Sequence, residues 1–90
     1  MELEYEPGKD AANIAKHGIS LADAMLVYEA PNKVTLQALR SGEDRLVDIA
    51  MVEVAGVVLV LVYVVRGSVV RAISLRRASR AERRMYEQAQ

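Results

Sequence analysis

The amino-acid sequence predicts a single α+β domain in which two N-terminal helices precede a small antiparallel β-sheet and one C-terminal helix follows it. Three observations lead to this prediction. Residues 10–31 carry helix-capping and helix-ending residues, and residues 34–76 are rich in β-branched side chains separated by short polar turns. Ser79-Arg80-Ala81-Glu82 then has the S-x-x-E pattern of a capping box. Ninety residues can bury one modest core, so we expect one domain over residues 1–90.

The N-terminal segment is expected to form an edge strand followed by a short helix. Leu3 and Tyr5 alternate with acidic residues, as in a strand with one buried face. Asp10 is expected to cap a helix over residues 11–16. Gly18 supplies the left-handed conformation that ends this helix.

A second helix and then four strands are expected next. The helix runs from Ser20 to about Glu29, because Ser20 and Asp23 resemble a capping box and Pro31 prevents the helix from continuing. The strands are joined by polar or glycine-containing turns, and the last turn is Gly67-Ser68. They are expected at residues 34–39, 45–54, 57–65 and 69–76. A final helix starts at the capping box.

The last hairpin predicts which side chains share a face of the sheet. If Gly67-Ser68 is a two-residue turn, Val64 lies opposite Arg71. Strict alternation then gives two sets of side chains. They are Arg66, Arg71, Ile73 and Leu75 on one face, and Tyr63, Ala72, Ser74 and Arg76 on the other. We expect helices to cover the first face and the second to hold a site, unless a β-bulge between Arg71 and Arg76 reunites the arginines.

Charge is distributed unevenly along the chain. Residues 66–90 hold seven arginines, no lysine and two glutamates, whereas residues 1–65 hold five basic and ten acidic residues. The chain is neutral overall but consists of two parts of opposite charge, which indicates a local anion-binding surface. Arginine suits bidentate contacts with phosphate. The alternative is a solvated helix face whose charges only keep the protein soluble.

Composition excludes several classes of site. The chain has no cysteine, which rules out disulfides, zinc–thiolate centres and thiol nucleophiles. It has one histidine and shows neither metal-ligand spacing nor a phosphate-binding loop, so we expect no metal and no cofactor. The apolar run over residues 57–65 is far shorter than the ~20 residues that cross a bilayer, and the acidic N-terminus lacks a signal core. We therefore expect a cytoplasmic protein with no membrane partner.

Four side chains in the first half are candidates for catalysis or RNA binding, and each also has a simpler structural interpretation. His17 can act as a general acid or base, or it can contact the last carbonyl groups of its helix. Lys16 can bind phosphate or remain solvated. Glu43 and Arg45 can place a carboxylate base beside an arginine, or they can form a polar turn.

RNA cleavage by the internal 2′-hydroxyl is the reaction that best fits these residue types. RNA carries its own nucleophile, so the protein need only align it, move protons and neutralise charge on the phosphate. Arg66, Arg71 and Arg76 are candidates for binding the phosphate from rigid strands. A carboxylate, or Tyr86 one helical turn after Arg83, is a candidate for moving protons. Tyr86 can also simply anchor the last helix on the sheet.

The order of short motifs along the chain resembles the BrnT family of toxins from bacterial type II toxin–antitoxin systems. The early matches are Tyr5-Glu6-Pro7, Lys9, and the N-x-x-K-H-G-[VI]-S pattern at Asn13 and Lys16-His17-Gly18-Ile19-Ser20. Glu43-Asp44-Arg45 is similar to the family's acid-acid-R segment. The late matches are Arg71, Ile73-Ser74-Leu75-Arg76, Ala78, Glu82-Arg83 and Tyr86, with Leu75 in place of the usual alanine.

This resemblance implies a RelE-like fold and an endoribonuclease that works without the ribosome and inhibits translation. Because no metal-ligand spacing is present, we expect the cleavage to be metal-independent. The implied partner is a BrnA-like ribbon-helix-helix antitoxin, through which alone the chain would reach operator DNA. The family's basic motif positions correspond to Arg66, Arg71, Arg76 and Arg83. His17, Glu43, Arg45 and Tyr86 are motif positions without an assigned catalytic role, and Lys16, Arg45 and Arg83 are candidates for RNA binding.

A second function stays open at the level of the sequence. The chain can be a catalytically silent module whose basic face only binds an acidic segment of an antitoxin-like protein. Direct binding of DNA by this chain alone is disfavoured, because the acidic first part would repel the duplex and no helix-turn-helix is present.

Overall fold

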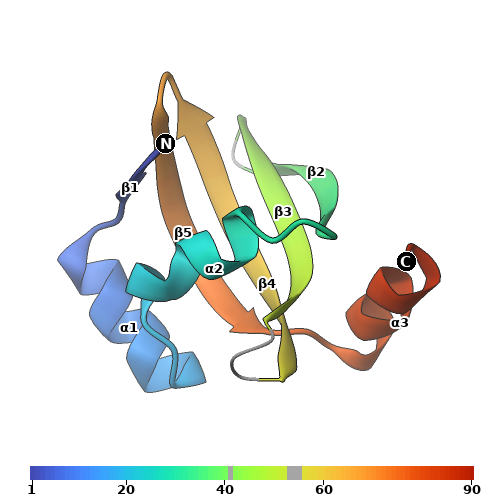
Figure 1. Ribbon diagram of the computed structural model, residues 1–90. Helices are drawn as coiled ribbons and strands as arrows, with labels where there is room; N and C mark the ends of the chain where they lie inside the picture. The colour runs from blue at the N-terminus through green and yellow to red at the C-terminus, as the bar shows by residue number, and fades with distance from the viewer. Residues whose placement is uncertain (41, 53–55) are drawn as a thin grey trace.

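The computed structural model of the protein describes residues 1–40, 42–52 and 56–90, without the side chains of residues 39, 40 and 43. These residues form a five-stranded sheet with helices packed beside it (Figure 1). In chain order the elements are β1 (Glu2–Glu4), α1 (Pro7–His17), the 3₁₀ helix η1 (Leu21–Asp23), α2 (Ala24–Tyr28), β2 (Val34–Arg40), β3 (Glu43–Val52), β4 (Val57–Arg66), β5 (Val69–Arg77) and α3 (Arg80–Gln88). The predicted α+β class is confirmed.

The sheet is mixed, whereas the sequence predicts an antiparallel one. Its order is β1-β5-β4-β3-β2, and the strands from β2 to β5 are antiparallel neighbours. β1 joins the other side of β5 and runs parallel to it, with Leu3 opposite Val70. The prediction is wrong here because β1 pairs with the last strand of the chain, so no hairpin turn sets its direction.

The N-terminal helices also differ from the predicted pair. α1 begins at Pro7, whose fixed φ suits the first helical position, and not after Asp10. The second predicted helix is divided into η1 and the five-residue α2. Asp10 explains the difference, because its Oδ1 accepts hydrogen bonds from the Ser20 hydroxyl at 3.0 Å and from the Leu21 N–H at 2.8 Å. This carboxylate caps the following element and not its own helix.

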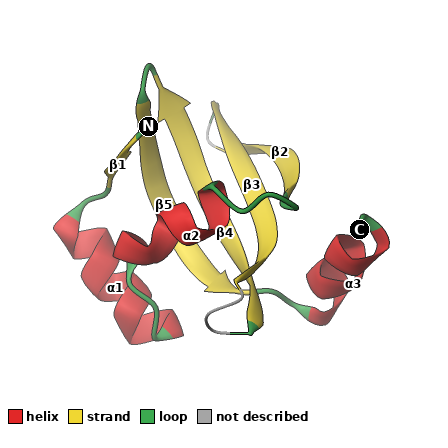
Figure 2. Ribbon diagram, in the orientation of Figure 1, coloured by secondary structure: helices red, strands yellow, loops and turns green. Residues whose placement is uncertain are grey.

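The hydrophobic core lies between one face of the sheet and the segment formed by η1 and α2, which crosses that face, while α1 packs beside β5 (Figure 2). Leu21 and Val27 are fully buried there against Tyr63 and Leu75 of the sheet. The ring of Tyr28 meets that of Tyr63 edge-on, with 5.4 Å between the ring centroids. No helix among the described residues is long and apolar enough to span a membrane.

A buried carboxylate fastens β2 to this core. Asp48 is fully buried and accepts hydrogen bonds from Lys33 Nζ at 2.8 Å and from the Thr35 hydroxyl at 2.6 Å. Lys33 Nζ also lies 4.1 Å from the centroid of the Tyr28 ring. Burial, together with the hydrogen bond to Asp48, raises the pKa of Tyr63 above its usual value. Since every charge in this network has a partner, its role is structural.

A β-bulge interrupts the pairing of β4 with β5. Tyr63 lies opposite Ala72, but the preceding residue of β4, Val62, lies opposite Ser74. Ile73 is therefore an extra residue on β5 without a partner on β4. An extra residue shifts the alternation of side chains by one position from that point onward.

The bulge overturns the predicted division of the hairpin's side chains. Arg71 lies opposite Val64, as expected. Beyond the bulge, however, Ser74 and Arg76 share the face of Arg71, whereas strict alternation puts them on the other one. Leu75 instead enters the core and is fully buried, as are Tyr63 and Ala72 apart from 1–2% of their surfaces. Arg71 and Arg76 are thus brought together on one face, whereas Arg77 lies on the other.

Candidate functional site

Three cavities meet at the bulge residue Ile73, on the arginine-bearing side of β5. The first, which we call the basic pocket, measures about 200 Å³ and is lined by Lys9, Arg45, Val64, Arg66, Arg71 and Ile73. The second, the strand pocket, measures about 520 Å³ and is lined by Leu36, Gln37, Ala38, Arg45, Val47, Val62, Ile73, Ser74, Arg76 and Glu82. The third, the helix pocket, measures about 280 Å³ and is lined by Lys9, Ala12, Asn13, Lys16, His17, Ile73 and Ser74.

Shared residues make these cavities one continuous surface, which we call the basic face. Arg45 lines both the basic pocket and the strand pocket. Lys9 lines both the basic pocket and the helix pocket. Ser74 lines both the strand pocket and the helix pocket. Because the cations come from three strands and one helix, the fold concentrates positive charge that is dispersed along the sequence.

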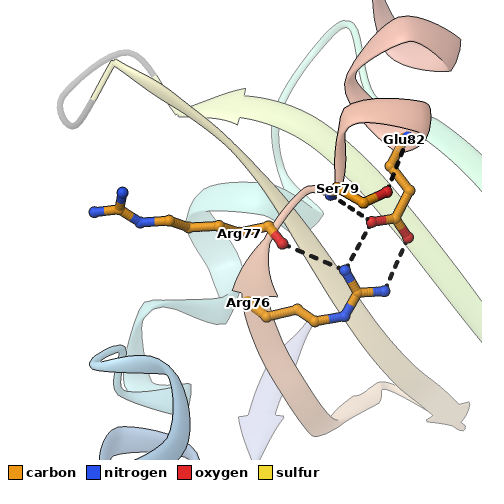
Figure 3. Close-up of polar contacts among 4 residues, drawn as sticks. All are labelled: Arg76, Arg77, Ser79 and Glu82. Carbon is orange, nitrogen blue, oxygen red and sulfur yellow. Dashed lines mark hydrogen bonds and ion pairs between the residues drawn. The ribbon is translucent and has the colours of Figure 1, made fainter.

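Arg76 makes the best-defined polar contact of the basic face (Figure 3). Its Nη1 donates to Glu82 Oε1 at 2.7 Å and its Nη2 donates to Glu82 Oε2 at 2.8 Å. Nη1 also donates to the carbonyl oxygen of Arg77 at 3.3 Å, while the Arg77 side chain extends away from the pair. This fork-to-fork geometry is the one that a guanidinium also adopts with phosphate.

The partner carboxylate has a second role at the start of α3. Glu82 Oε1 accepts from the Ser79 N–H at 2.8 Å, and the Ser79 hydroxyl accepts from the Glu82 N–H at 3.2 Å. The predicted capping box is therefore confirmed. The hydrogen bonds from Arg76 lower the pKa of Glu82 from its ordinary 4.5 to about 2, and the same contact raises the pKa of Arg76. At neutral pH this pair is fully ionised.

Arg71 is also bound to a carboxylate of the chain itself. Its Nη2 donates to Oε1 of Glu6, the residue that precedes α1. Both side chains are well exposed, at 31% for Arg71 and 55% for Glu6. Solvent screens the attraction between two exposed charges, so this pair contributes little to the stability of the fold. An incoming anion can therefore displace Glu6 from Arg71 at low cost.

Asn13 explains how Lys16 and His17 come to lie on the basic face. Its Nδ2 donates to the carbonyl oxygens of Ile19 and Leu75, at 2.8 and 2.7 Å, and its Oδ1 accepts from the Leu75 N–H at 3.1 Å. These bonds fix α1 against β5, beyond the short β1 strand. Lys16 and His17, in the last turn of α1, then line the helix pocket as neighbours of Ser74.

The remaining candidates lie elsewhere. Tyr86 is buried and lines a groove of about 410 Å³ formed with α2 and the end of β3, not one of the three pockets around Ile73. Arg83 is exposed on α3 and lines none of those pockets in the described part of the chain. Glu43 begins β3, two residues before Arg45, and its side chain lies outside the described residues.

Sequence reasoning missed the part that two side chains take in the basic face. Lys9 is only a motif position in the sequence, and its place between two pockets follows from the start of α1 at Pro7. Glu82 is predicted in the capping box and matches a family motif, but its contact with Arg76 is not predicted. Gln37 also lines the strand pocket, but it pairs with Leu46, which pairs with Tyr63, so its side chain lies on the core face of the sheet. Within the described residues, no three acidic, histidine or cysteine side chains group as metal ligands would.

The residues of this site lie within a segment that matches a known protein family. Residues 5–82 match the family model described as the ribonuclease toxin, BrnT, of type II toxin-antitoxin systems. The chain belongs to the BrnT family. No curated protein matches the sequence. The matched BrnT segment contains every residue that lines the three pockets, and membership in a type II toxin family implies RNA as substrate and an antitoxin as partner.

Proposed function

We propose that this BrnT protein is a metal-independent endoribonuclease formed by one toxin domain over residues 1–90, which cleaves RNA and thereby inhibits translation. The description of the family as a ribonuclease toxin supports the reaction class. A BrnA-like ribbon-helix-helix antitoxin neutralises the protein, and operator DNA is bound only through that antitoxin.

The observation that carries this proposal is the bulge at Ile73. It turns Arg76 to the same face as Arg71 and leaves that face lined by cations from neighbouring elements. Side chains on paired strands lose little further freedom when a phosphate binds, so charge placed there stabilises the transition state more effectively than charge on a tail. Arg66, Arg71 and Arg76 are the groups that we assign to the scissile phosphate.

The reaction follows from the chemistry of RNA. The 2′-oxygen forms a bond to phosphorus, and the bond from phosphorus to the 5′-oxygen of the next nucleotide breaks. The 2′-hydroxyl proton passes to a base and the departing 5′-oxygen receives a proton, which gives a 2′,3′-cyclic phosphate and a free 5′-hydroxyl. Guanidinium groups neutralise the charge that builds up on the phosphate oxygens, which is the electrostatic role that a metal ion performs in other nucleases.

Proton transfer is assigned to His17, with the flanking backbone bound by Lys16 and Arg45. The imidazole lies in the helix pocket, whose wall residues Ile73 and Ser74 also line the strand pocket next to Arg76. An imidazole can both accept and donate a proton, which suits either half of the reaction. Glu43 stays a candidate for the second proton transfer by its position in the sequence, and buried Tyr86 and exposed Arg83 have no role in this scheme.

The test is cleavage of RNA by the purified protein in EDTA. We expect products that end in a 2′,3′-cyclic phosphate, and about a hundredfold slower cleavage for Arg71→Ala. Arg84→Ala, which removes an exposed arginine of α3, is the matched control and should cleave at the wild-type rate. A folded wild-type protein that leaves RNA intact would overturn the proposal.

A second candidate function is favoured by one specific observation. Arg71 and Arg76 are each bound to a carboxylate of the same chain, so the basic face binds carboxylates. An acidic segment of an antitoxin would make the same contacts in a silent binding module. Absence of RNA cleavage together with tight binding of the antitoxin would establish that alternative.

A further inference from the structure

We propose that the strand pocket binds a nucleobase of the RNA next to the scissile phosphate, and that Ser74 makes cleavage selective for the base. This inference rests on the proposed function, because it names the part of the substrate that the second cavity of the same face takes.

The walls of the strand pocket suit a flat apolar ring better than a phosphate. Leu36 and Ala38 of β2, Val47 of β3 and Val62 of β4 are aliphatic and stand on adjacent strands. At about 520 Å³ the cavity lies within the size range of small-molecule sites, which are mostly apolar with a few convergent polar groups. A phosphate would lose hydration against these side chains, whereas the face of a base would lose little.

Polar groups occupy the remaining side of the pocket. The Ser74 hydroxyl can act as either a donor or an acceptor. The Gln37 side chain does not face the pocket, because Gln37 pairs with Leu46 and Leu46 pairs with Tyr63 of the core. The Glu82 carboxylate, whose depressed pKa keeps it ionised, is only an acceptor. Base edges differ in their pattern of donors and acceptors, so fixed side-chain groups of this kind distinguish one base from another.

The position of the pocket relative to the cations supplies the link to RNA. Arg45 and Ile73 form a wall shared with the basic pocket, and Arg76 lies in the wall of the strand pocket itself. Arg45 and Ile73 separate the two pockets. When the phosphate of a nucleotide contacts Arg71 or Arg45 in the basic pocket, its base can therefore reach the adjacent strand pocket. The two cavities have the complementary chemistry of a nucleotide, which is charged at one end and flat and apolar at the other.

The pocket differs from common single-strand RNA sites in its lack of aromatic rings. None of the described side chains in its wall is aromatic, and Tyr63 and Tyr86 are buried in the core. Stacking on an aromatic ring holds any base, whatever its identity. A base held here by aliphatic contacts depends more on the hydrogen bonds at its edge, so we expect weak binding of isolated nucleotides but a marked base preference in cleavage.

The first experiment measures binding without cleavage. Methyl NMR spectra of the protein are recorded with each of the four nucleoside 3′-monophosphates and, separately, with inorganic phosphate. We expect nucleotides to shift the methyl signals of Ala38 and Val62, while inorganic phosphate shifts signals near the basic pocket only. Equal shifts of Ala38 and Val62 with inorganic phosphate, or none with any nucleotide, would overturn the inference.

The second experiment maps cleavage sites in a mixed-sequence RNA. Ser74→Ala should reduce the preference for the favoured base at the cut by about five- to tenfold. Ala38→Leu, which fills the pocket, should slow cleavage at favoured sites more than at others. Ala22→Leu makes the same substitution at an exposed site outside the pockets and should leave the pattern unchanged. Cleavage with an unaltered base preference in both pocket variants would refute the base pocket and leave the ribonuclease intact.

A protein that does not cleave RNA would refute the proposed function but not decide the base pocket, which the NMR shifts decide independently.

Discussion

The Arg76 guanidinium and the Glu82 carboxylate form a two-pronged ion pair that links the last strand to the last helix, with contacts of 2.7 and 2.8 Å. The two residues are six positions apart and lie in different elements. The arginine that we assign to the phosphate therefore also holds α3 in place. Any substitution of Arg76 changes both binding and local stability, and experiments on it must separate these effects.

A double-mutant cycle achieves that separation. Arg76→Ala, Glu82→Gln and the double variant should show a coupling of about 1 kcal/mol in the free energy of unfolding, because each single variant loses the same pair. RNA cleavage should fall about a hundredfold in Arg76→Ala and in the double variant, but much less in Glu82→Gln, which keeps the arginine and loses only the charge of one acceptor of the strand pocket. Urea unfolding and initial cleavage rates measure the two quantities. If Glu82→Gln loses as much activity as Arg76→Ala, the pair acts as a structural unit and Arg76 is not a phosphate ligand.

The pair also predicts how stability depends on pH. The folded protein lowers the pKa of Glu82 from 4.5 to about 2, so the unfolded chain binds more protons between these values. The stabilising contribution of Glu82 is therefore complete above about pH 4.5 and is lost as the pH falls towards 2. Unfolding free energies of wild type and Glu82→Gln, compared from pH 6 to 2, should converge over this interval. A difference that stays constant across the interval would show that the carboxylate is not held ionised by Arg76.

Asn13 should be among the polar residues that contribute most to stability. Asn13→Ala removes three hydrogen bonds and leaves the buried N–H and C=O of Leu75 without this partner, at a cost of about 3 kcal/mol. Urea unfolding of the wild type and the variant measures this difference in the free energy of unfolding. Asn32→Ala, at an exposed asparagine, is the matched control and should change stability by less than about 0.5 kcal/mol. Equal effects at the two positions would show that the amide does not fasten α1 to β5.

Glu6 should oppose RNA binding without contributing much to the fold. Glu6→Gln releases Arg71, and we expect RNA affinity to rise about threefold at low salt while the melting temperature stays nearly constant. The gain should shrink as salt is added, because screening weakens the contact of Arg71 with phosphate. Glu87→Gln, which removes an equal charge from exposed α3, controls for net charge. A similar gain in that variant would mean that Arg71 has no special part in binding.

Local signals in the sequence predict the parts of this fold that local chemistry determines. The capping box at Ser79 and the helix end at Gly18 need only a few neighbouring residues, and both are present as predicted. The direction of β1 could not be predicted, because its partner lies more than sixty residues away. The start of α1 was misplaced because the Asp10 carboxylate can cap either its own helix or the next element, and only tertiary packing selects between them.

The arrangement of the candidate site was partly predictable. The register of the last hairpin predicts Arg66 and Arg71 on one face, but the place of Arg76 on that face requires the bulge. Because Ile73 and Leu75 are both aliphatic, the hydrophobic pattern of β5 fits a strand with the bulge and a strand without it. Burial of Leu75 beneath the helices selects the strand with the bulge. Lys9 comes to the site from α1, and no pattern within its own segment indicates this.

The side chain of Asn13 makes the same two hydrogen bonds to β5 that the backbone of a neighbouring strand would make. β1 ends at Glu4, and beyond it the amide of Asn13 supplies the donor and the acceptor that a neighbouring strand would offer to Leu75. A strand whose backbone groups are already engaged cannot recruit a strand from another molecule. On that side of the sheet β1 presents three residues and Asn13 engages Leu75 beyond it, whereas the opposite edge strand β2 presents seven residues. Edge-to-edge association between molecules is therefore expected at β2. The side-chain amide of Asn13 helps to protect β5, the strand that carries Arg71 and Arg76, from such association.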